Sequence, residues 1–162
     1  PNTRGPNGEI GLVAALHGEN MAAAEALFAR PDIRLDLLDG AGESALMMAA
    51  LRGDLGWCER LIARGAPVNK PGWSPLHYAA SGPEPKIIAL LLERGAIVDA
   101  ESPDRTTPLM MAARYGKEDS VKLLLARGAD AKRTNDRNMN AADFARGSGR
   151  EWLAEMLTKA GG

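Results

Sequence analysis

Hydrophobic and polar positions along this chain follow a long period. A short phrase, made of a hydroxyl or amide residue, a proline or alanine, and then mostly apolar residues, occurs four times. The four copies are Ser44–Met47, Ser74–His77, Thr107–Met110 and Asn140–Asp143. Their first residues are 30, 33 and 33 positions apart. A regular spacing of this size is typical of a protein built from stacked repeats.

Each phrase predicts the start of a helix. The hydroxyls of Ser74 and Thr107 can accept a hydrogen bond from a backbone N–H in the first turn. Pro75 and Pro108 then fall at the first helical position, where the missing N–H costs nothing. A buried leucine and a pair of alanines follow, and the small alanines let neighbouring helices approach closely. These residues are Leu46, Leu76 and Leu109, with Ala49–Ala50, Ala79–Ala80 and Ala112–Ala113.

A second helix follows in each unit. Its apolar positions lie within 57–62, 87–92 and 121–125, and each stretch is followed by an Arg-Gly-Ala sequence. Gly65, Gly95 and Gly128 are expected in the left-handed conformation that ends a helix. The preceding arginine suits the negative end of the helix dipole. A short extended stretch then leads to the next capped helix.

The pattern resembles the ankyrin repeat, over essentially all 162 residues. The resemblance implies an all-α repeat protein, an ankyrin-repeat solenoid of helix-turn-helix units with short β-hairpin loops. We expect a single domain, 1–162, with units at about 5–38, 39–69, 70–101, 102–134 and 135–162. The third unit is shortened at 70–73, which predicts a clipped hairpin. Because 1–4 matches the closing stretch of a unit, we expect at least one further repeat upstream.

Composition argues against several classes of function. The net charge is −1 and there is no run of basic residues, so binding to nucleic acid is not expected. The apolar runs are shorter than the roughly 18 residues needed to span a bilayer, so membrane insertion is not expected. Cys58 is the single cysteine and stands at a core position, which predicts a small buried hydrophobe.

The sequence offers little catalytic or metal-binding chemistry. His17 and His77 are the two histidines, and they lie two repeats apart. Metal sites need clustered ligands, so we expect no metal and no cofactor. The resemblance implies that His77 ties adjacent loops together, and His17 is expected at the surface. With Ser44 and Ser74 assigned as helix caps, no catalytic residue is predicted and the protein is not expected to be an enzyme. Acidic residues that meet across repeats remain open.

Two methionine pairs have two interpretations. Met47–Met48 and Met110–Met111 stand at the same place in their units, where one of each pair is expected to face the core and the other the loops. They are either core filler, because methionine adapts to irregular gaps, or a soft, oxidation-sensitive surface for a partner.

The resemblance also implies a binding surface, the concave side made by the hairpin tips and the exposed face of each first helix. The tip residues are Glu43, Trp73, Thr106 and Met139, and the helix residues are Leu51, Arg52, Ser81, Arg114 and Tyr115. Tryptophan, tyrosine and arginine are the types that dominate interface energetics. Trp73 could instead cover the clipped hairpin by packing on Pro71 or Pro75. Trp152 either covers the last repeat or contacts another segment or chain.

These observations predict a protein–protein interaction module, a scaffold or adaptor that binds another protein on the concave face. The alternative is a small-ligand sensor or an enzyme with a site in the concave groove. The Ala- and Arg-rich repeats resemble those of bacterial ankyrin proteins, many of which carry an export signal, so both the periplasm and the cytoplasm are candidate compartments. We expect a monomer.

Overall fold

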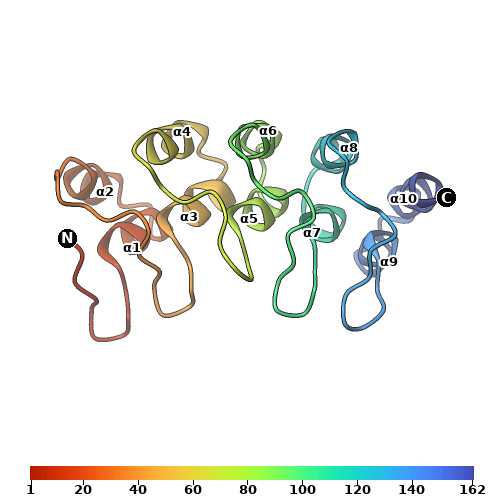
Figure 1. Cartoon of the computed structure of the whole chain (residues 1–162), viewed down its shortest axis with the longest axis horizontal. Coiled ribbons are helices and arrows are strands. Elements are labelled where there is room, and N and C mark those ends of the chain that lie inside the picture. The colour runs from red at the N-terminus through yellow and green to blue at the C-terminus, as the bar shows by residue number, and fades with distance from the viewer.

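The computed structural model describes all 162 residues, and it contains ten α-helices that follow one another as five pairs. The helices are α1 (Gly11–His17), α2 (Met21–Phe28), α3 (Ala45–Arg52), α4 (Leu55–Ala63), α5 (Pro75–Ser81), α6 (Pro85–Glu93), α7 (Pro108–Tyr115), α8 (Glu118–Ala126), α9 (Ala141–Gly147) and α10 (Glu151–Gly161). Figure 1 shows the odd-numbered helices in one layer, the even-numbered helices in a second layer, and the two termini at opposite ends. The all-helical repeat solenoid is therefore confirmed.

The helix starts and ends follow the expected chemistry. Ser44 Oγ accepts from the Met47 N–H at 3.2 Å, and Thr107 Oγ1 accepts from the Met110 N–H at 3.4 Å. These bonds satisfy donors that a helix N-terminus leaves unpaired. The second helices end as predicted, because the glycine that closes each of α4, α6 and α8 has a positive φ. These residues are Gly65 (93°), Gly95 (91°) and Gly128 (90°).

One continuous core runs along the stack between the two layers. The anchor residues Leu46, Leu76 and Leu109 are buried, and so are the alanine pairs that follow them. Full burial of a leucine side chain stabilises a fold by roughly 1.5–3 kcal/mol, so these repeated anchors hold each unit against the next. The small alanines leave room for α3, α5 and α7 to pack side by side along one layer.

The loops that precede the first helices are tighter than regular β-hairpins. The structure has one isolated bridge, between Arg4 and Ile10, and no extended strand. The loops before α3, α7 and α9 each contain a backbone hydrogen bond that joins their two ends, beside a second one within the turn. The bonds that join the ends are Asp39 N–H to Glu43 O (2.9 Å), Ser102 N–H to Thr106 O (3.0 Å) and Asn135 N–H to Met139 O (3.0 Å).

The loop before α5 is different, and Figure 1 shows that it projects less far than its neighbours. A side chain closes it, because Lys70 Nζ donates to the carbonyl of Trp73 at 2.9 Å. The clipped hairpin expected at 70–73 is thus present. Trp73 is the last residue before the cap of α5, so the shortened loop brings its indole close to that helix.

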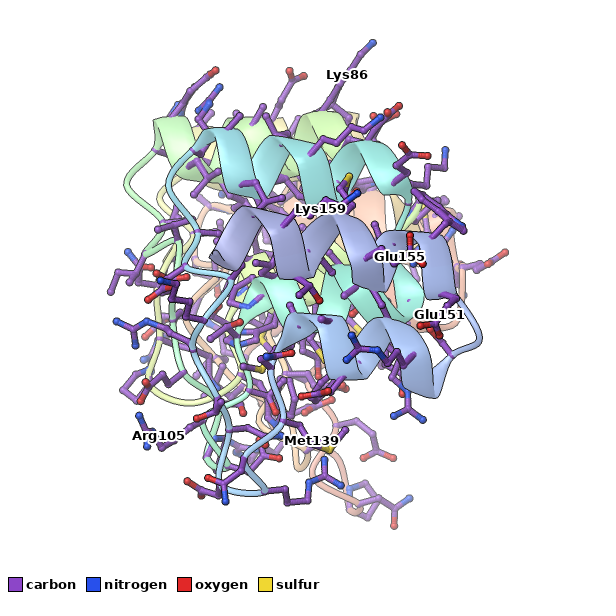
Figure 2. The ribbon with its side chains drawn as sticks, turned by 90° about the vertical axis from the view of Figure 1, so that its right-hand side faces the viewer. Lys86, Arg105, Met139, Glu151, Glu155 and Lys159 are labelled. Carbon is purple, nitrogen blue, oxygen red and sulfur yellow. The ribbon has the colours of Figure 1, made fainter.

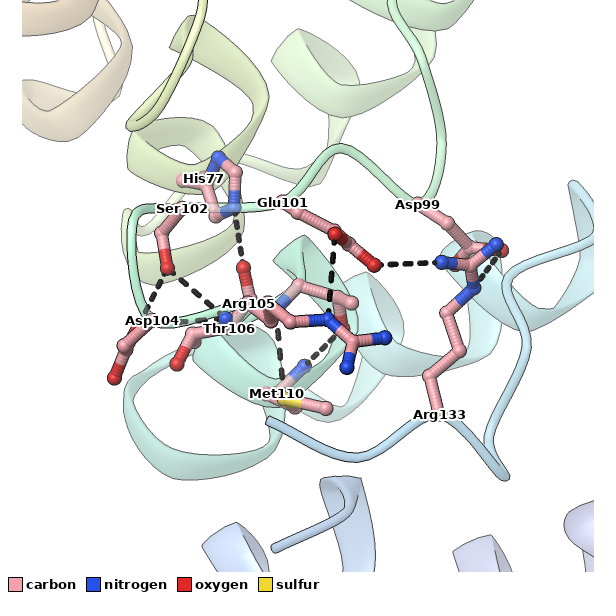
Figure 3. Close-up of polar contacts among 10 residues, drawn as sticks. His77, Asp99, Glu101, Ser102, Asp104, Arg105, Thr106, Met110 and Arg133 are labelled. Atoms are coloured by element: carbon pink, nitrogen blue, oxygen red, sulfur yellow. Dashed lines mark hydrogen bonds and ion pairs between the residues drawn. The ribbon is translucent and has the colours of Figure 1, made fainter. Parts of the chain in front are cut away.

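Neighbouring loops are joined by polar contacts as well as by the core. Arg133 donates to Glu101 at 2.9 Å and lies 3.5 Å from Asp99, both in the loop of the preceding unit (Figure 3). Figure 2 shows the stack from the end that carries α10, where Glu151, Glu155 and Lys159 lie on the helix. None of the helices combines the length and the apolar character needed to cross a bilayer.

The methionine pairs behave differently from each other, which corrects one expectation. Met47 and Met48 are both buried, so the expectation that one of them faces the loops is wrong. Met48 is held beneath His17, whose Nδ1 lies 3.3 Å from its sulfur. In the other pair Met110 is buried and Met111 is half-buried. The predicted surface position of His17 and the predicted burial of Cys58 are both confirmed.

Candidate functional site

A hollow of about 410 Å³ lies on the layer of first helices. It is bounded by residues of three neighbouring first helices, α3, α5 and α7, and by Trp73, which precedes the cap of α5. Its lining residues are Leu51, Trp73, His77, Tyr78, Ser81, Met111 and Tyr115. The volume is within the range of about 300–1,000 Å³ that is typical of ligand pockets. Five of the seven lining residues are hydrophobic, so the hollow is mainly apolar.

The register of the repeats explains why the hollow is where it is. Ser81 stands 30 residues after Leu51 and 33 before Arg114, the same offsets that separate the capping residues. A small serine in α5 therefore lies between a leucine in α3 and an arginine in α7. Because the serine side chain is small, it leaves space at this position. The larger side chains of the neighbouring units border that space.

Three of the polar side chains that line the hollow are already hydrogen-bonded within the chain. His77 is 0% exposed, and its Nε2 lies 2.8 Å from the carbonyl of Thr106 while its Nδ1 lies 3.1 Å from the Ser74 N–H. The Tyr78 hydroxyl donates to Glu43 at 2.7 Å, and Ser81 Oγ donates to the His77 carbonyl at 3.1 Å. The Tyr115 hydroxyl and the indole N–H of Trp73 are the lining polar groups that have no partner in the structure.

Burial and hydrogen bonding set the charge state of the groups that titrate in the hollow. Burial lowers the pKa of His77, and the carbonyl of Thr106 offsets part of this effect, so the imidazole is held neutral. Burial also raises the pKa of Tyr78, and the carboxylate of Glu43 adds to the shift. Both groups are therefore neutral at pH 7, and neither presents a charge to the hollow.

The edge of the hollow exposes apolar and aromatic surface. Leu51 is 41% exposed and Tyr115 is 58% exposed, so both present carbon surface to solvent beside the hollow. Trp73 is half-buried and packs edge-on against His77, with the ring centroids 5.2 Å apart. The guanidinium of Arg114 lies 5.3 Å from the ring centroid of Tyr115 and forms no ion pair.

The structure brings together some of the residues predicted for the binding surface. Leu51, Trp73, Ser81 and Tyr115 line the hollow, and Arg114 lies at its edge against Tyr115. Glu43 does not line it and is connected to it only through the hydrogen bond that it accepts from Tyr78. Whether these residues contact a partner stays a prediction.

Three predicted residues lie elsewhere or are occupied. Thr106 is 2% exposed, so its side chain cannot reach a partner, and its inclusion was wrong. It is buried because its N–H donates to Ser102 Oγ at 2.9 Å and its carbonyl faces His77 (Figure 3). Arg52 is paired with Glu19 at 2.9 Å. Met139 does not line the hollow and lies near the hairpin end of the last unit (Figure 2).

The predicted binding surface lacked three lining residues: His77, which was assigned a structural role, and Tyr78 and Met111. Tyr78 and Met111 follow His77 and Met110 and occupy the same position of their units, 33 residues apart. A residue one place after the phrase, read in each copy, would have identified both of them. The predicted set instead used the loop tips and the residues after the alanine pairs, which lie on either side of this position.

No group of three or more His, Cys, Asp or Glu side chains in the structure is arranged to hold a metal ion. The carboxylates that do meet across repeats are bound to arginines. One example is Glu25, which accepts two bonds from Arg60 at 2.6 and 2.7 Å. The hollow therefore presents aromatic and aliphatic side chains to a ligand, and the guanidinium of Arg114 lies at one edge.

Comparison with known proteins gives a consistent result. Residues 12–102 match the family model described as ankyrin repeats (3 copies), and residues 91–145 match that described as ankyrin repeats (many copies). The chain is 37% identical over 146 residues to human neurogenic locus notch homolog protein 4, covering 80% of this chain and 7% of that protein. It is 34% identical over 130 residues to the ankyrin repeat and KH domain-containing protein mask-1 of Caenorhabditis elegans, covering 74% and 5%. It is 40% identical over 101 residues to the nuclear factor NF-kappa-B p105 subunit of Gallus gallus, covering 59% and 10%.

The chain spans a tenth or less of the length of these three relatives, all of which are animal proteins. The resemblance to bacterial ankyrin proteins therefore stays a prediction. The family models together cover most of the chain, from α1 to α9. On this match and on the five stacked helix pairs, the chain belongs to the ankyrin-repeat family.

Proposed function

We propose that this chain is a non-catalytic protein-interaction module that binds a partner protein on the layer of first helices, across the hollow between α3 and α7. Ankyrin repeats generally bind other proteins, and stacked repeats present extended surfaces for this purpose. The observation that carries the proposal is the exposure of Leu51 and Tyr115 beside a mainly apolar hollow. Exposed apolar patches with polar surroundings mark interaction sites.

The character of the hollow favours this function over an enzyme or a small-ligand sensor. Such a site would need converging carboxylates or accessible histidines with shifted pKa values. The histidine in the hollow is fully buried and both ring nitrogens face partners within the chain. We accordingly propose no cofactor and no nucleic-acid partner, and a monomer in the absence of the partner.

Affinity capture from the native host tests this function. We expect Leu51→Ala with Tyr115→Ala to weaken capture of the partner by about tenfold or more, as expected for residues central to an interface. Both side chains are exposed in the folded protein, so the double variant should keep its helical content, which circular dichroism checks. Trp73→Ala with Tyr115→Ala is a second test, but Trp73 also packs on His77.

The matched control is Ile97→Ala with Trp152→Ala. These side chains are 59% and 51% exposed, and neither lines the hollow. This control removes comparable apolar surface and should leave capture unchanged. If the control weakens capture and the Leu51/Tyr115 variant does not, the binding face is elsewhere.

A further inference from the structure

We propose that the hollow receives one large apolar side chain of the partner, on a segment that also carries a carboxylate which contacts Arg114. This inference rests on the proposed function and specifies the chemistry of the partner. It follows from three features: the hydrogen bonds that already occupy His77, Tyr78 and Ser81, the space at Ser81, and the distribution of charge around the edge of the hollow.

The hydrogen bonding requires an apolar occupant. Ser81 Oγ, the Tyr78 hydroxyl and both ring nitrogens of His77 already have partners within the chain. A hydrogen-bond acceptor placed among these three side chains would lose its bonds to water and find no free donor, which is unfavourable. The unpaired donors of the lining, the Trp73 indole N–H and the Tyr115 hydroxyl, belong to the residues at the edge of the hollow. An aliphatic or aromatic side chain has no such cost, and it gains contact with Leu51, Trp73 and Met111.

The repeat register limits the size of the occupant. Leu51 fills the position in α3 that Ser81 occupies in α5. The space at Ser81 is thus where a larger side chain of the stack itself would lie, and the partner supplies the missing side chain. The hollow is open to solvent between α3 and α7, so a side chain can enter without any change in the backbone.

Charge determines what lies beside that side chain. Arg114 has no ion pair or hydrogen bond, whereas Arg52 is occupied by Glu19. The Tyr115 hydroxyl is also without a partner, so a cation and an O–H donor lie together at the end of α7. A guanidinium fork matches a carboxylate geometrically. Glu43, in the loop before α3, accepts a hydrogen bond from the lining residue Tyr78, so the acidic residue of the partner is expected at the α7 side.

A random dodecapeptide display library, selected on the immobilised protein, tests this chemistry. We expect enriched peptides to share a large apolar residue with Asp or Glu one to three positions away. One enriched peptide is then synthesised with a fluorophore, and its affinity is measured by fluorescence polarisation. Replacement of its acid by Asn or Gln should weaken binding about fivefold at low salt, with less effect at high salt.

Variants of the protein locate the two contacts. Ser81→Leu introduces the side chain that Leu51 already presents in α3, so it should fill the hollow without unfolding the stack. This variant should bind the peptide about tenfold more weakly, or weaker still. Arg114→Glu should lower the affinity for the acidic peptide and leave the affinity for its Asn or Gln version unchanged. The matched control is Arg94→Glu, which reverses an arginine without an ion pair at the end of α6 and should leave both peptides unaffected.

The results separate this inference from the proposed function. Suppose that the selected peptides compete with the captured partner and bind less tightly to Ser81→Leu, but show no preference for an acid and no response to Arg114→Glu. This result would overturn the inferred chemistry and leave the binding face intact. Peptides that bind equally to the protein and to Ser81→Leu would overturn the inferred anchor site. Failure of the Leu51/Tyr115 variant to affect capture would overturn the proposed function itself.

Discussion

His77 and Thr106 are joined across a repeat boundary, with Nε2 of the imidazole 2.8 Å from the threonine carbonyl (Figure 3). A carbonyl only accepts, so Nε2 carries the proton and Nδ1 is the acceptor for the Ser74 N–H at 3.1 Å. The Ser74 hydroxyl lies 2.9 Å from the same Nδ1. One buried side chain therefore fastens the loop before α5 to the loop before α7.

The neighbouring units lack this connection. Met47 and Met110 occupy the position of His77, and their sulfurs accept from the Ser44 and Thr107 N–H groups at 3.4 Å. A thioether has no donor, so neither methionine can reach the next loop in the same way. The bond from His77 is thus specific to the junction between the third and fourth units, which is also the junction beneath the hollow.

His77→Met is expected to destabilise the protein by about 1–3 kcal/mol, because it leaves the buried carbonyl of Thr106 without its donor. Urea unfolding followed by circular dichroism measures the change. Met110→Leu is the control, since it keeps the volume and removes only a weak sulfur contact, and its cost should stay below about 1.5 kcal/mol. Equal stability of His77→Met and the parent protein would show that the bond contributes nothing net.

Stability is also expected to fall as the pH is lowered below about 6.5, the ordinary pKa of histidine. Burial lowers the pKa of His77 in the folded state, so the unfolded chain binds a proton at a higher pH than the folded chain does. Stability therefore decreases from pH 6.5 down to the folded pKa, and is constant below it as far as this group is concerned. Carboxylates with lowered pKa values, such as Asp104, contribute only at lower pH, below about 4.

Urea midpoints measured between pH 5 and pH 8 check this dependence. The His77→Met variant provides the comparison, because it should lose most of the decrease between pH 6.5 and pH 5. If His77→Met retains the full decrease in stability, a different titrating group causes that decrease.

The sequence was sufficient to predict the helices because each boundary depends on local chemistry. A hydroxyl cap at Thr107 and a left-handed glycine at Gly128 act within a few residues of themselves, and their recurrence in register fixes the stack. The role of His77 as a tie between loops was expected from the resemblance to the ankyrin repeat.

The candidate site was predicted less completely, because its shape depends on contacts between units. Thr106 was expected at a hairpin tip but is buried, since its carbonyl is used by His77 of the preceding unit. Met48 is covered by His17, which is 31 residues away in the chain. The hollow itself arises from an absent side chain at Ser81 between two larger ones, and a single repeat read by itself does not show this.

Gly116→Ala is expected to destabilise the stack by about 1–3 kcal/mol, as overpacking usually does. The φ of Gly116 is −83°, which any residue adopts, so its conformation is not the reason. A Cβ at this position would overlap the carbonyl oxygen of Ala80 and would lie 2.9 Å from Cα of Ala112. The backbones of α5 and α7 approach too closely there for any side chain.

Thermal unfolding of Gly116→Ala and Gly56→Ala makes the comparison direct. Gly56 lies in α4, and the nearest atom to an added Cβ is Asp54 Oδ1 at 3.7 Å. Alanine favours a helix over glycine, so this variant should be more stable by up to about 1 kcal/mol. If both variants shift the midpoint in the same direction, close packing at Gly116 is not the controlling factor.

Cys58 is expected to resist thiol reagents in the folded protein. Burial raises the pKa of the thiol to about 12, and the carboxylates of Asp54 and Glu59 add to the shift, so almost no thiolate is present at pH 8. Ellman's reagent should therefore label one thiol per chain at once in urea, and only slowly without it. Reaction of the native protein then requires α4 to open, so its rate reports the free energy of that opening.

Gly116→Ala, which weakens the packing of α5 against α7, should accelerate labelling only as far as it lowers global stability. Rapid labelling of the parent protein would instead mean that α4 opens independently of the rest of the stack.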